Sequence, residues 1–313
     1  MKTINKSRIL AILMLFAASS FMLTSCNKDD EDKPQPMPQQ KSIVEIASST
    51  PEFSILVEAL TKADLVNTIN ASDNLTVFAP TNSAFQALFT ELGVSGISEI
   101  SKETLTPILL YHVLGAKVPA ASVTTGYAYT LSPGKGAKTL ALYLNTSNGV
   151  KINNSAQVTT ADVMATNGVI HVINQVLLPN SVVDIARNNG SFSILVEALV
   201  KADLVTALTG TGPFTVFAPT NDAFNALFAT LNVNGIADLT KEQLTPILLY
   251  HVVSGNVLST DLTSGNVPTL NGATLAINIT SGVTLNGSTS VILEDVQGTN
   301  GVVHAIDKVL LPL

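Results

Sequence analysis

The chain repeats itself once, and this duplication limits its possible folds more than any other feature. Residues 42–112 recur as 181–251 at a constant offset of 139, with about 43 of 71 aligned positions identical. A second pair of segments, 167–179 and 300–312, is offset by 133. Each copy has about 135 residues, which suits a single domain, and two copies are too few for a solenoid. We therefore predict two tandem domains, copy one (42–179) and copy two (181–313), each with its own core.

The change of offset places six extra residues in copy one. The stretch 132–138, Ser-Pro-Gly-Lys-Gly-Ala-Lys, has no evident counterpart in copy two, so we place the insertion there. Its Gly-Lys pair is not followed by the Ser or Thr that a phosphate-binding loop requires. We therefore expect an exposed surface loop.

Helical periodicity precedes strand periodicity within each copy. Apolar residues at 53, 56, 57 and 60 have helical spacing, Asn82 could cap the next helix, and Thr240 to Gln243 forms a capping-box pattern. Later apolar runs at 140–144, 150–152 and 169–176 are separated by Asn-Gly pairs, which favour tight hairpins. Helices followed by antiparallel strands predict an α+β domain.

Composition and motifs exclude several classes of function. With 46% hydrophobic residues the bulk of the chain is not disordered, and with 16 Lys and Arg against 23 Asp and Glu we expect no nucleic-acid partner. The chain has neither the Gly-x-Ser-x-Gly nor the His-Glu-x-x-His motif of hydrolases. We therefore predict no catalytic residues, no metal site and no cofactor.

The first 25 residues have the pattern of a secretory signal peptide. Lys2, Lys6 and Arg8 precede an apolar stretch over 9–23, and small residues lead to Cys26, the chain's only cysteine. This arrangement resembles the bacterial lipoprotein cleavage box, in which the cysteine is lipidated. We expect a signal peptide over 1–25 and attachment to the membrane through lipid at Cys26.

The segment 26–41 is predicted to be a linker. An acidic run over 29–32 follows Lys28 and resembles the tag that sends Bacteroidota lipoproteins to the outer face of the outer membrane, although it could be an ordinary solvated charge run. The prolines of 33–41 favour an extended conformation. We therefore expect an outer-membrane lipoprotein displayed at the cell surface.

Three segments in each copy resemble the hallmark segments of the fasciclin domain. They are Thr-Val-Phe-Ala-Pro-Thr-Asn at 76–82 and 215–221, a Tyr-His pair, and an Asn-Gly-Val segment that ends in Val-Leu-Leu-Pro. The resemblance covers nearly all of 42–313. It implies a β-wedge of two small sheets packed with several helices. It also implies an extracellular adhesion and matrix-binding module without a shared catalytic activity.

The four histidines are distributed two per copy, which raises the question of a metal or acid-base site. His112 and His251 fall on the apolar face of a helical segment, while His171 and His304 alternate with apolar residues of a strand. A histidine on an apolar face is more often a hydrogen-bonded core residue. We expect all four to be buried and hydrogen-bonded.

The resemblance also implies binding residues, because two segments of this kind contribute to integrin binding in animal family members. By position, the corresponding residues in this chain are Asp162, Val163, Tyr111 and His112 in copy one, and Asp295, Val296, Tyr250 and His251 in copy two. Gln297 and Gly298 then depart from the pattern. In the alternative interpretation the two aspartates only terminate a turn before the hairpin.

Taken with the anchor, these features predict a surface adhesion lipoprotein that recognises an extracellular protein or polysaccharide. Two alternatives stay open. One is a structural lipoprotein that organises the envelope or a matrix without a specific receptor. The other is a hydrolytic or metal-dependent enzyme that uses the Tyr-His and Asp positions.

Overall fold

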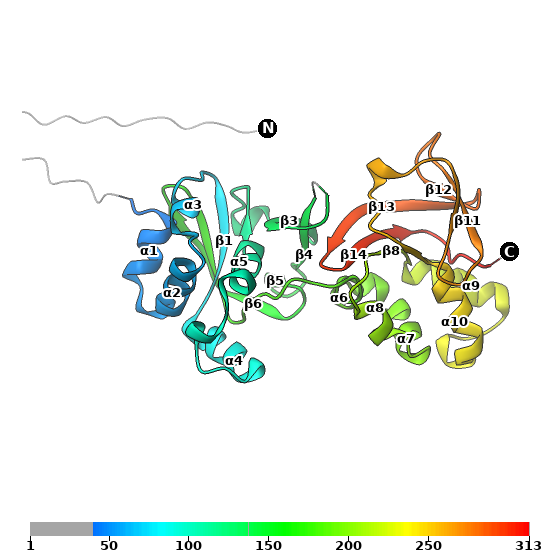
Figure 1. Cartoon of the computed structure of the whole chain (residues 1–313), viewed down its shortest axis with the longest axis horizontal. Helices are drawn as coiled ribbons and strands as arrows, with labels where there is room; N and C mark the ends of the chain where they lie inside the picture. The colour runs from blue at the N-terminus through cyan, green and yellow to red at the C-terminus, as the bar shows by residue number, and fades with distance from the viewer. Residues whose placement is uncertain (1–39, 137, 313) are drawn as a thin grey trace, which may run out of the picture. The chain divides into compact units, whose positions relative to one another are not determined.

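The computed structural model describes residues 40–136 and 138–312. The predicted signal peptide, Cys26 and residues 26–39 of the linker lie outside these residues. Figure 1 shows helices and strands in each copy; contrary to the predicted order, the first strand of each copy lies between its third and fourth helices in the chain. Among the described residues, no helix combines the length and the apolar character that crossing a bilayer would need.

Each copy begins with helices of the same order and similar length. Copy one contains α1 (Ile43–Ser49), α2 (Ser54–Lys62), α3 (Val66–Asn70), α4 (Asn82–Leu92) and α5 (Lys102–Tyr111). Copy two contains α6 (Val182–Asn188), α7 (Ser193–Lys201), α8 (Val205–Thr209), α9 (Asn221–Leu231) and α10 (Lys241–Tyr250). Two short 3-10 turns, η3 (Ala120–Ser122) and η6 (Ser259–Asp261), follow the last helix of each copy.

Each copy has seven strands, which occur in the same order along the chain. Copy one has β1 (Leu75–Pro80), β2 (Val113–Leu114), β3 (Gly126–Pro133), β4 (Thr139–Asn145), β5 (Lys151–Ile152), β6 (Ala156–Ala165) and β7 (Gly168–Ile173). Copy two has β8 (Phe214–Pro219), β9 (Val252–Ser254), β10 (Gly265–Pro268), β11 (Thr274–Asn278), β12 (Thr284–Leu285), β13 (Thr289–Gly298) and β14 (Gly301–Ile306).

The strands of copy one close into a barrel in the order β1-β2-β3-β4-β5-β6-β7, whereas those of copy two form an open sheet in the order β10-β11-β12-β13-β14-β8-β9. The first residues of β6 pair with β5, and the rest of β6 pairs with β7. Strand β13 divides its pairing between β12 and β14 in the same way. The first strand of each copy then lies parallel to the last, β1 on β7 and β8 on β14. The α+β class with two tandem domains is therefore confirmed.

Six of the ten α-helices in the described residues begin with a side-chain cap, and one cap differs from the sequence prediction. Thr240 and Gln243 form the predicted capping box of α10. Helix α4, however, is capped by Thr81 rather than by Asn82. The Asn82 side chain instead accepts a hydrogen bond from the backbone N–H of Ile55 at 3.0 Å. Asn82 therefore ties α4 to the start of α2, a contact between segments that no local pattern reveals.

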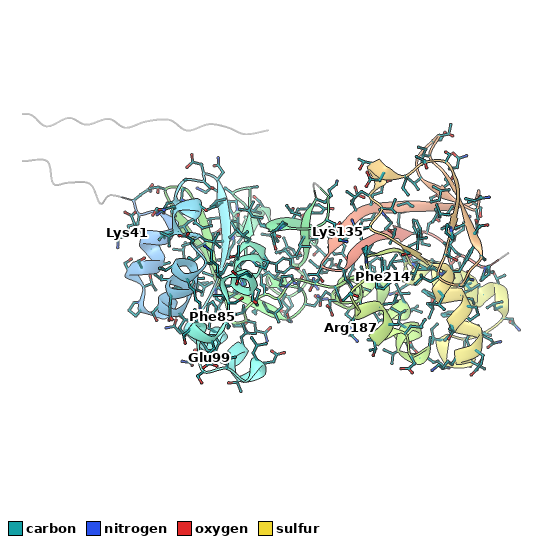
Figure 2. The ribbon with its side chains drawn as sticks, in the orientation of Figure 1. Lys41, Phe85, Glu99, Lys135, Arg187 and Phe214 are labelled. Atoms are coloured by element: carbon teal, nitrogen blue, oxygen red, sulfur yellow. The ribbon has the colours of Figure 1, made fainter. Side chains whose placement is uncertain are left out.

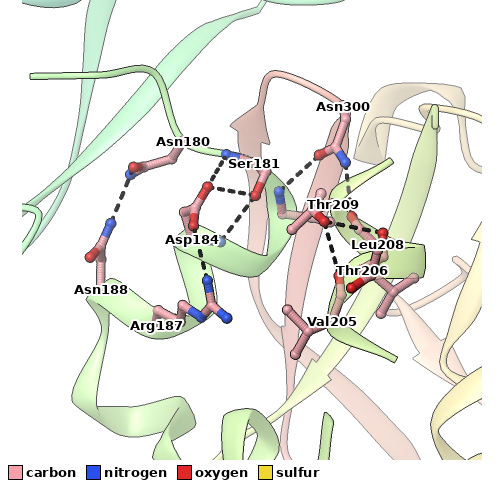
Figure 3. Close-up of polar contacts among 11 residues, drawn as sticks. Asn180, Ser181, Asp184, Arg187, Asn188, Val205, Thr206, Leu208, Thr209 and Asn300 are labelled. Atoms are coloured by element: carbon pink, nitrogen blue, oxygen red, sulfur yellow. Dashed lines mark hydrogen bonds and ion pairs between the residues drawn. The ribbon is translucent and has the colours of Figure 1, made fainter. Parts of the chain in front are cut away.

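In each copy, the Asn of the Asn-Gly pair before the last strand holds helices against the sheet. Asn300 Oδ1 accepts the N–H of Val182 at the start of α6, and its Nδ2 donates to the carbonyl of Leu208 at 2.9 Å (Figure 3). Asn167 makes the same contacts with Ile43 and Ile69 in copy one. The predicted hairpin between β6 and β7 is thus confirmed, and its asparagine also fixes two helices.

Each copy has one apolar cluster between helices and sheet and a second one enclosed by strands. In copy one, Phe53 and Phe85 belong to the helical cluster, while Phe78, Tyr111 and Leu142 belong to the strand cluster. Copy two repeats this division. The described residues thus form four such clusters, two per copy, and Ala141 of β4 belongs to the helical cluster of copy two.

The insertion of copy one lengthens the β3–β4 hairpin. Strand β3 has eight residues, whereas its counterpart β10 has four. Figure 2 shows Lys135 in the turn of this hairpin. The hairpin is not the free surface loop that we expected, because Lys138 forms an ion pair with Asp295 of copy two. The longer hairpin of copy one therefore reaches Asp295 of copy two.

Candidate functional site

Asp162 lies at a bulge in β6, where the pairing with β7 shifts register between Thr160 and Val163. Its φ of 59° is a left-handed conformation, which Asp tolerates better than most residues. Its N–H donates to Nδ1 of His171 at 3.3 Å, and its Oδ1 accepts the N–H of Ala120 at 2.9 Å. Because Ala120 is the first residue of η3, the carboxylate caps this turn.

Asp295 has the same geometry in β13 of copy two. Its φ is 61°, and its N–H donates to Nδ1 of His304 at 3.2 Å. Its carboxylate accepts the N–H of Ser259 at 2.7 Å and the hydroxyl of the same residue at 2.8 Å. Both aspartates therefore hold backbone in place, but at a 3-10 turn distant in sequence and not at a turn before the hairpin, where the alternative interpretation put them. A structural role does not prevent an exposed oxygen from binding a partner.

The two aspartates differ in what covers them. The Asp295 side chain is only 7% exposed, and its Oδ2 lies 3.1 Å from Nζ of Lys138 in copy one. The hydroxyl of Tyr129 also donates to the carbonyl oxygen of Asp295 at 3.4 Å. Asp162 is exposed, and no ion pair within the described residues involves it. The Asp162 carboxylate of copy one is thus exposed, whereas the equivalent Asp295 carboxylate of copy two is covered by a contact within the chain.

The electrostatics of the Asp295 pair favour both charged forms. Burial would raise the pKa of the Asp295 carboxyl, but the hydrogen bonds from Ser259 and the Lys138 ammonium outweigh burial and hold this pKa below its usual range. The hydrogen bond and the charge of Asp295 in turn raise the pKa of Lys138. The pair is therefore fully ionised at neutral pH.

The residues next to each aspartate also differ between the copies. On β6, Val163 is partly buried and Met164 is 51% exposed. On β13, Val296 and Gln297 are both buried. Sequence reasoning did not identify Met164 or Lys138. The Met-for-Gln difference is visible in the repeat, but nothing in the sequence predicts a contact between Lys138 and a residue far along the chain.

The Tyr-His pairs do not lie on the surface. In copy one, Tyr111 donates to the carbonyl of Ala141 at 2.7 Å. His112 Nε2 accepts the N–H of Leu177 at 2.8 Å, so its Nδ1 carries the proton and donates to the carbonyl of Ile108. Tyr250 and His251 are buried in the same way in copy two. In the folded domains these four side chains cannot touch a partner directly, because they join helix, sheet and the closing segment inside the protein.

The prediction of buried, hydrogen-bonded histidines is confirmed for all four. Burial lowers the pKa of His112 and of His251 to about 4, and a hydrogen bond to a backbone carbonyl opposes this shift only in part. Both rings are neutral at physiological pH. Among residues 40–136 and 138–312, no three His, Cys, Asp or Glu side chains are grouped closely enough to hold a metal ion.

Comparison with known proteins agrees with the geometry of the repeat. The fasciclin domain profile matches residues 51–179 and 190–312. The chain therefore belongs to the fasciclin domain family, whose domains serve in cell adhesion and binding. A solved FAS1 domain pair from the insect cell adhesion molecule Fasciclin I has a TM-score of 0.50 and 20% identity, and the match covers 81% of this chain and 95% of that chain.

Similar sequences occur in bacteria and animals. Protein sll1483 of Synechocystis is 45% identical over 132 residues, which are 42% of this chain and 73% of that protein. Pig transforming growth factor-beta-induced protein ig-h3 is 31% identical over 250 residues, and human periostin is 30% identical over 249 residues. These two matches cover 76% and 78% of this chain but only 35% and 29% of the animal proteins. The chain thus spans about a third of their length.

Proposed function

We propose that this protein is a lipid-anchored adhesion protein of the cell surface, which binds an extracellular protein or polysaccharide through its tandem fasciclin domains and has no enzymatic activity. The observation that supports this proposal most is the exposed carboxylate of Asp162. Its Oδ1 caps η3, whereas its Oδ2 makes no hydrogen bond within the described residues. A rigidly held carboxylate with one free oxygen suits the recognition of a partner.

The anchor is supported by the sequence around Cys26. The cysteine directly follows an apolar export segment, and the proline-containing stretch behind it can hold the domains away from the membrane. Cys26→Ala should abolish lipidation, because the thiol is the attachment point, and should move the protein out of the detergent phase in a partition experiment. If the variant still partitions like the wild type, the lipoprotein proposal fails.

The two alternatives have less support. An enzyme would need reactive groups that reach a substrate, but Tyr111, His112 and their counterparts in copy two are enclosed and hydrogen-bonded. A purely structural lipoprotein would not need a free carboxylate at a fixed position. We therefore favour binding, and expect Asp162 to contribute to it.

The test is adhesion of intact cells that display the full chain to immobilised matrix proteins and polysaccharides. Asp162→Asn removes the charge but tolerates the left-handed backbone and can still cap η3. We expect it to reduce adhesion at least fivefold with little change in melting temperature. Asp64→Asn is the matched control, since Asp64 is also exposed and left-handed, with a φ of 63°. Equal adhesion by both variants would remove Asp162 from the binding surface.

A further inference from the structure

The surface of copy two around Asp295 already has an occupant, the β3–β4 hairpin of copy one. We call this surface the Asp295 edge; it consists of Asp295 to Gln297 on β13 together with Leu258 and Ser259. Three contacts of the hairpin define the mode of binding. The Lys138 ammonium pairs with the Asp295 carboxylate at 3.1 Å, and the Tyr129 hydroxyl donates to the Asp295 carbonyl. Gly134 lies so close that an added Cβ would come within 2.6 Å of the Gln297 side chain.

Copy one has an equivalent surface. This Asp162 edge consists of Asp162 to Met164 on β6 together with Pro119 and Ala120, which precede and begin η3. The bulge, the left-handed φ and the hydrogen bond to the strand histidine are the same as in copy two. Within the described part of the chain, however, no cation pairs with Asp162.

One substitution between the copies leaves the Asp162 carboxylate less satisfied. In copy two the Ser259 hydroxyl donates to Asp295 Oδ2, the oxygen that also meets Lys138. Copy one has Ala120 at this position and thus no hydroxyl to donate. The free oxygen of Asp162 corresponds to the lysine-binding oxygen of Asp295. This oxygen of Asp162 is therefore open to a hydrogen-bond donor or cation from outside the chain.

We propose that the Asp162 edge binds a lysine-bearing hairpin loop of a protein partner in the same mode in which the Asp295 edge binds the hairpin of copy one. This inference rests on the proposed binding function and specifies its ligand. A protein loop is favoured over a polysaccharide, because neutral sugars carry no cation and acidic sugars would be repelled by the carboxylate. Exposed Met164 replaces buried Gln297, so the partner should carry an apolar residue beside its lysine.

The chain supplies its own probe for this proposal. A head-to-tail cyclised peptide of residues 127–145 contains Tyr129, Gly134 and Lys138, the residues that contact the Asp295 edge. Binding of this peptide to the purified, immobilised full chain is measured at steady state by surface plasmon resonance. A small exposed contact of this kind predicts a dissociation constant of roughly 1 mM, weakened further by added salt.

Variants on both sides of the contact make the test specific. We expect Lys138→Ala in the peptide to weaken binding at least fivefold, whereas Lys135→Ala, at the exposed turn, should change it less than twofold. Asp162→Asn in the full chain should weaken binding as Lys138→Ala does, while Asp64→Asn should not. Contacts between opposite strands in the peptide's NMR spectrum establish that it forms a hairpin.

A second measurement locates the contact directly. A zero-length carbodiimide cross-linker should join Lys138 of the peptide, rather than Lys135, to Asp162, and mass spectrometry should identify the linked pair. The proposal is overturned if a folded hairpin does not bind at 5 mM, a concentration about five times the expected dissociation constant, or if its binding is indifferent to Asp162→Asn. If cell adhesion still depends on Asp162 while only polysaccharides bind there, this inference fails but the proposed function stands.

Discussion

At the scale of single residues, the histidines show how a group that looks reactive in sequence becomes structural. His112 and His251 each accept a backbone N–H through Nε2 and donate through Nδ1, so both ring nitrogens are used within the fold. The ring connects the end of α5 or α10 to the segment that closes the domain. The apolar spacing in the sequence predicted burial, but the partners of the rings became known only from the structure.

This burial predicts a dependence of stability on pH. Unfolded histidine has a pKa near 6.5, whereas His112 and His251 have pKa values of about 4 in the fold, so the unfolded chain binds more protons between these limits. Their contribution is complete above pH 6.5 and is lost as the pH falls toward 4. We expect the free energy of unfolding to fall by roughly 1–2 kcal/mol per domain between pH 7 and pH 5.

Urea unfolding at the two pH values measures this change. The control is His112→Gln with His251→Gln, which should lower stability overall but remove most of its dependence on pH, because Gln does not titrate. A wild type that is equally stable at pH 7 and pH 5 would contradict neutral, buried rings.

At the scale of elements, the hairpin that joins β6 to β7 illustrates both the reach and the limit of sequence patterns. The Asn-Gly pair predicted a turn, and a turn is present. The pattern did not show that Asn167 also binds the first residue of α1 and the last turn of α3. Thr81, rather than Asn82, caps α4 for a similar reason, since Asn82 is used by a helix distant in sequence. Local sequence patterns predict where helices and turns form. Hydrogen bonds between segments distant in sequence determine the structural role of each side chain.

Gly168 provides a test at this scale. A Cβ at this position would overlap the carbonyl oxygen of Leu75 on the neighbouring parallel strand, so Gly168→Ala must push β7 away from β1. We expect a loss of about 2–4 kcal/mol in the free energy of unfolding. Gly96→Ala is the control, since nothing lies within 4 Å of its added Cβ. The melting temperatures of both variants are measured by calorimetry. Equal melting temperatures would contradict the close approach of the strands.

At the scale of the whole molecule, the duplication predicted two domains of the same fold, with an insertion in copy one, and the surfaces of the two domains differ. Both copies hold an aspartate in the same backbone geometry, but the longer hairpin of copy one covers only that of copy two. The fold and the position of the insertion could be predicted from the repeat. The asymmetry could not, because Lys138 and Asp295 lie far apart in the sequence and no local pattern pairs them.

A double-mutant cycle on Lys138 and Asp295 tests the contact between the copies. The Lys138 side chain is partly exposed, so solvent screens the pair and we expect a coupling energy of only about 0.5–1 kcal/mol. The single variants Lys138→Ala and Asp295→Asn, and their combination, are measured by urea unfolding at low and high salt. Lys135→Ala is the control on the same loop. A coupling energy of zero at low salt would show that the ion pair does not hold the hairpin.

The long hairpin also affects how the two edges compete for partners outside the chain. Because the hairpin is part of the same folded chain and already contacts the Asp295 edge, an external loop can bind there only by displacing it. No tether supplies such a competitor at the Asp162 edge. The duplicated protein is therefore expected to behave toward low concentrations of partner as a monovalent receptor, even though it carries two domains of the same fold.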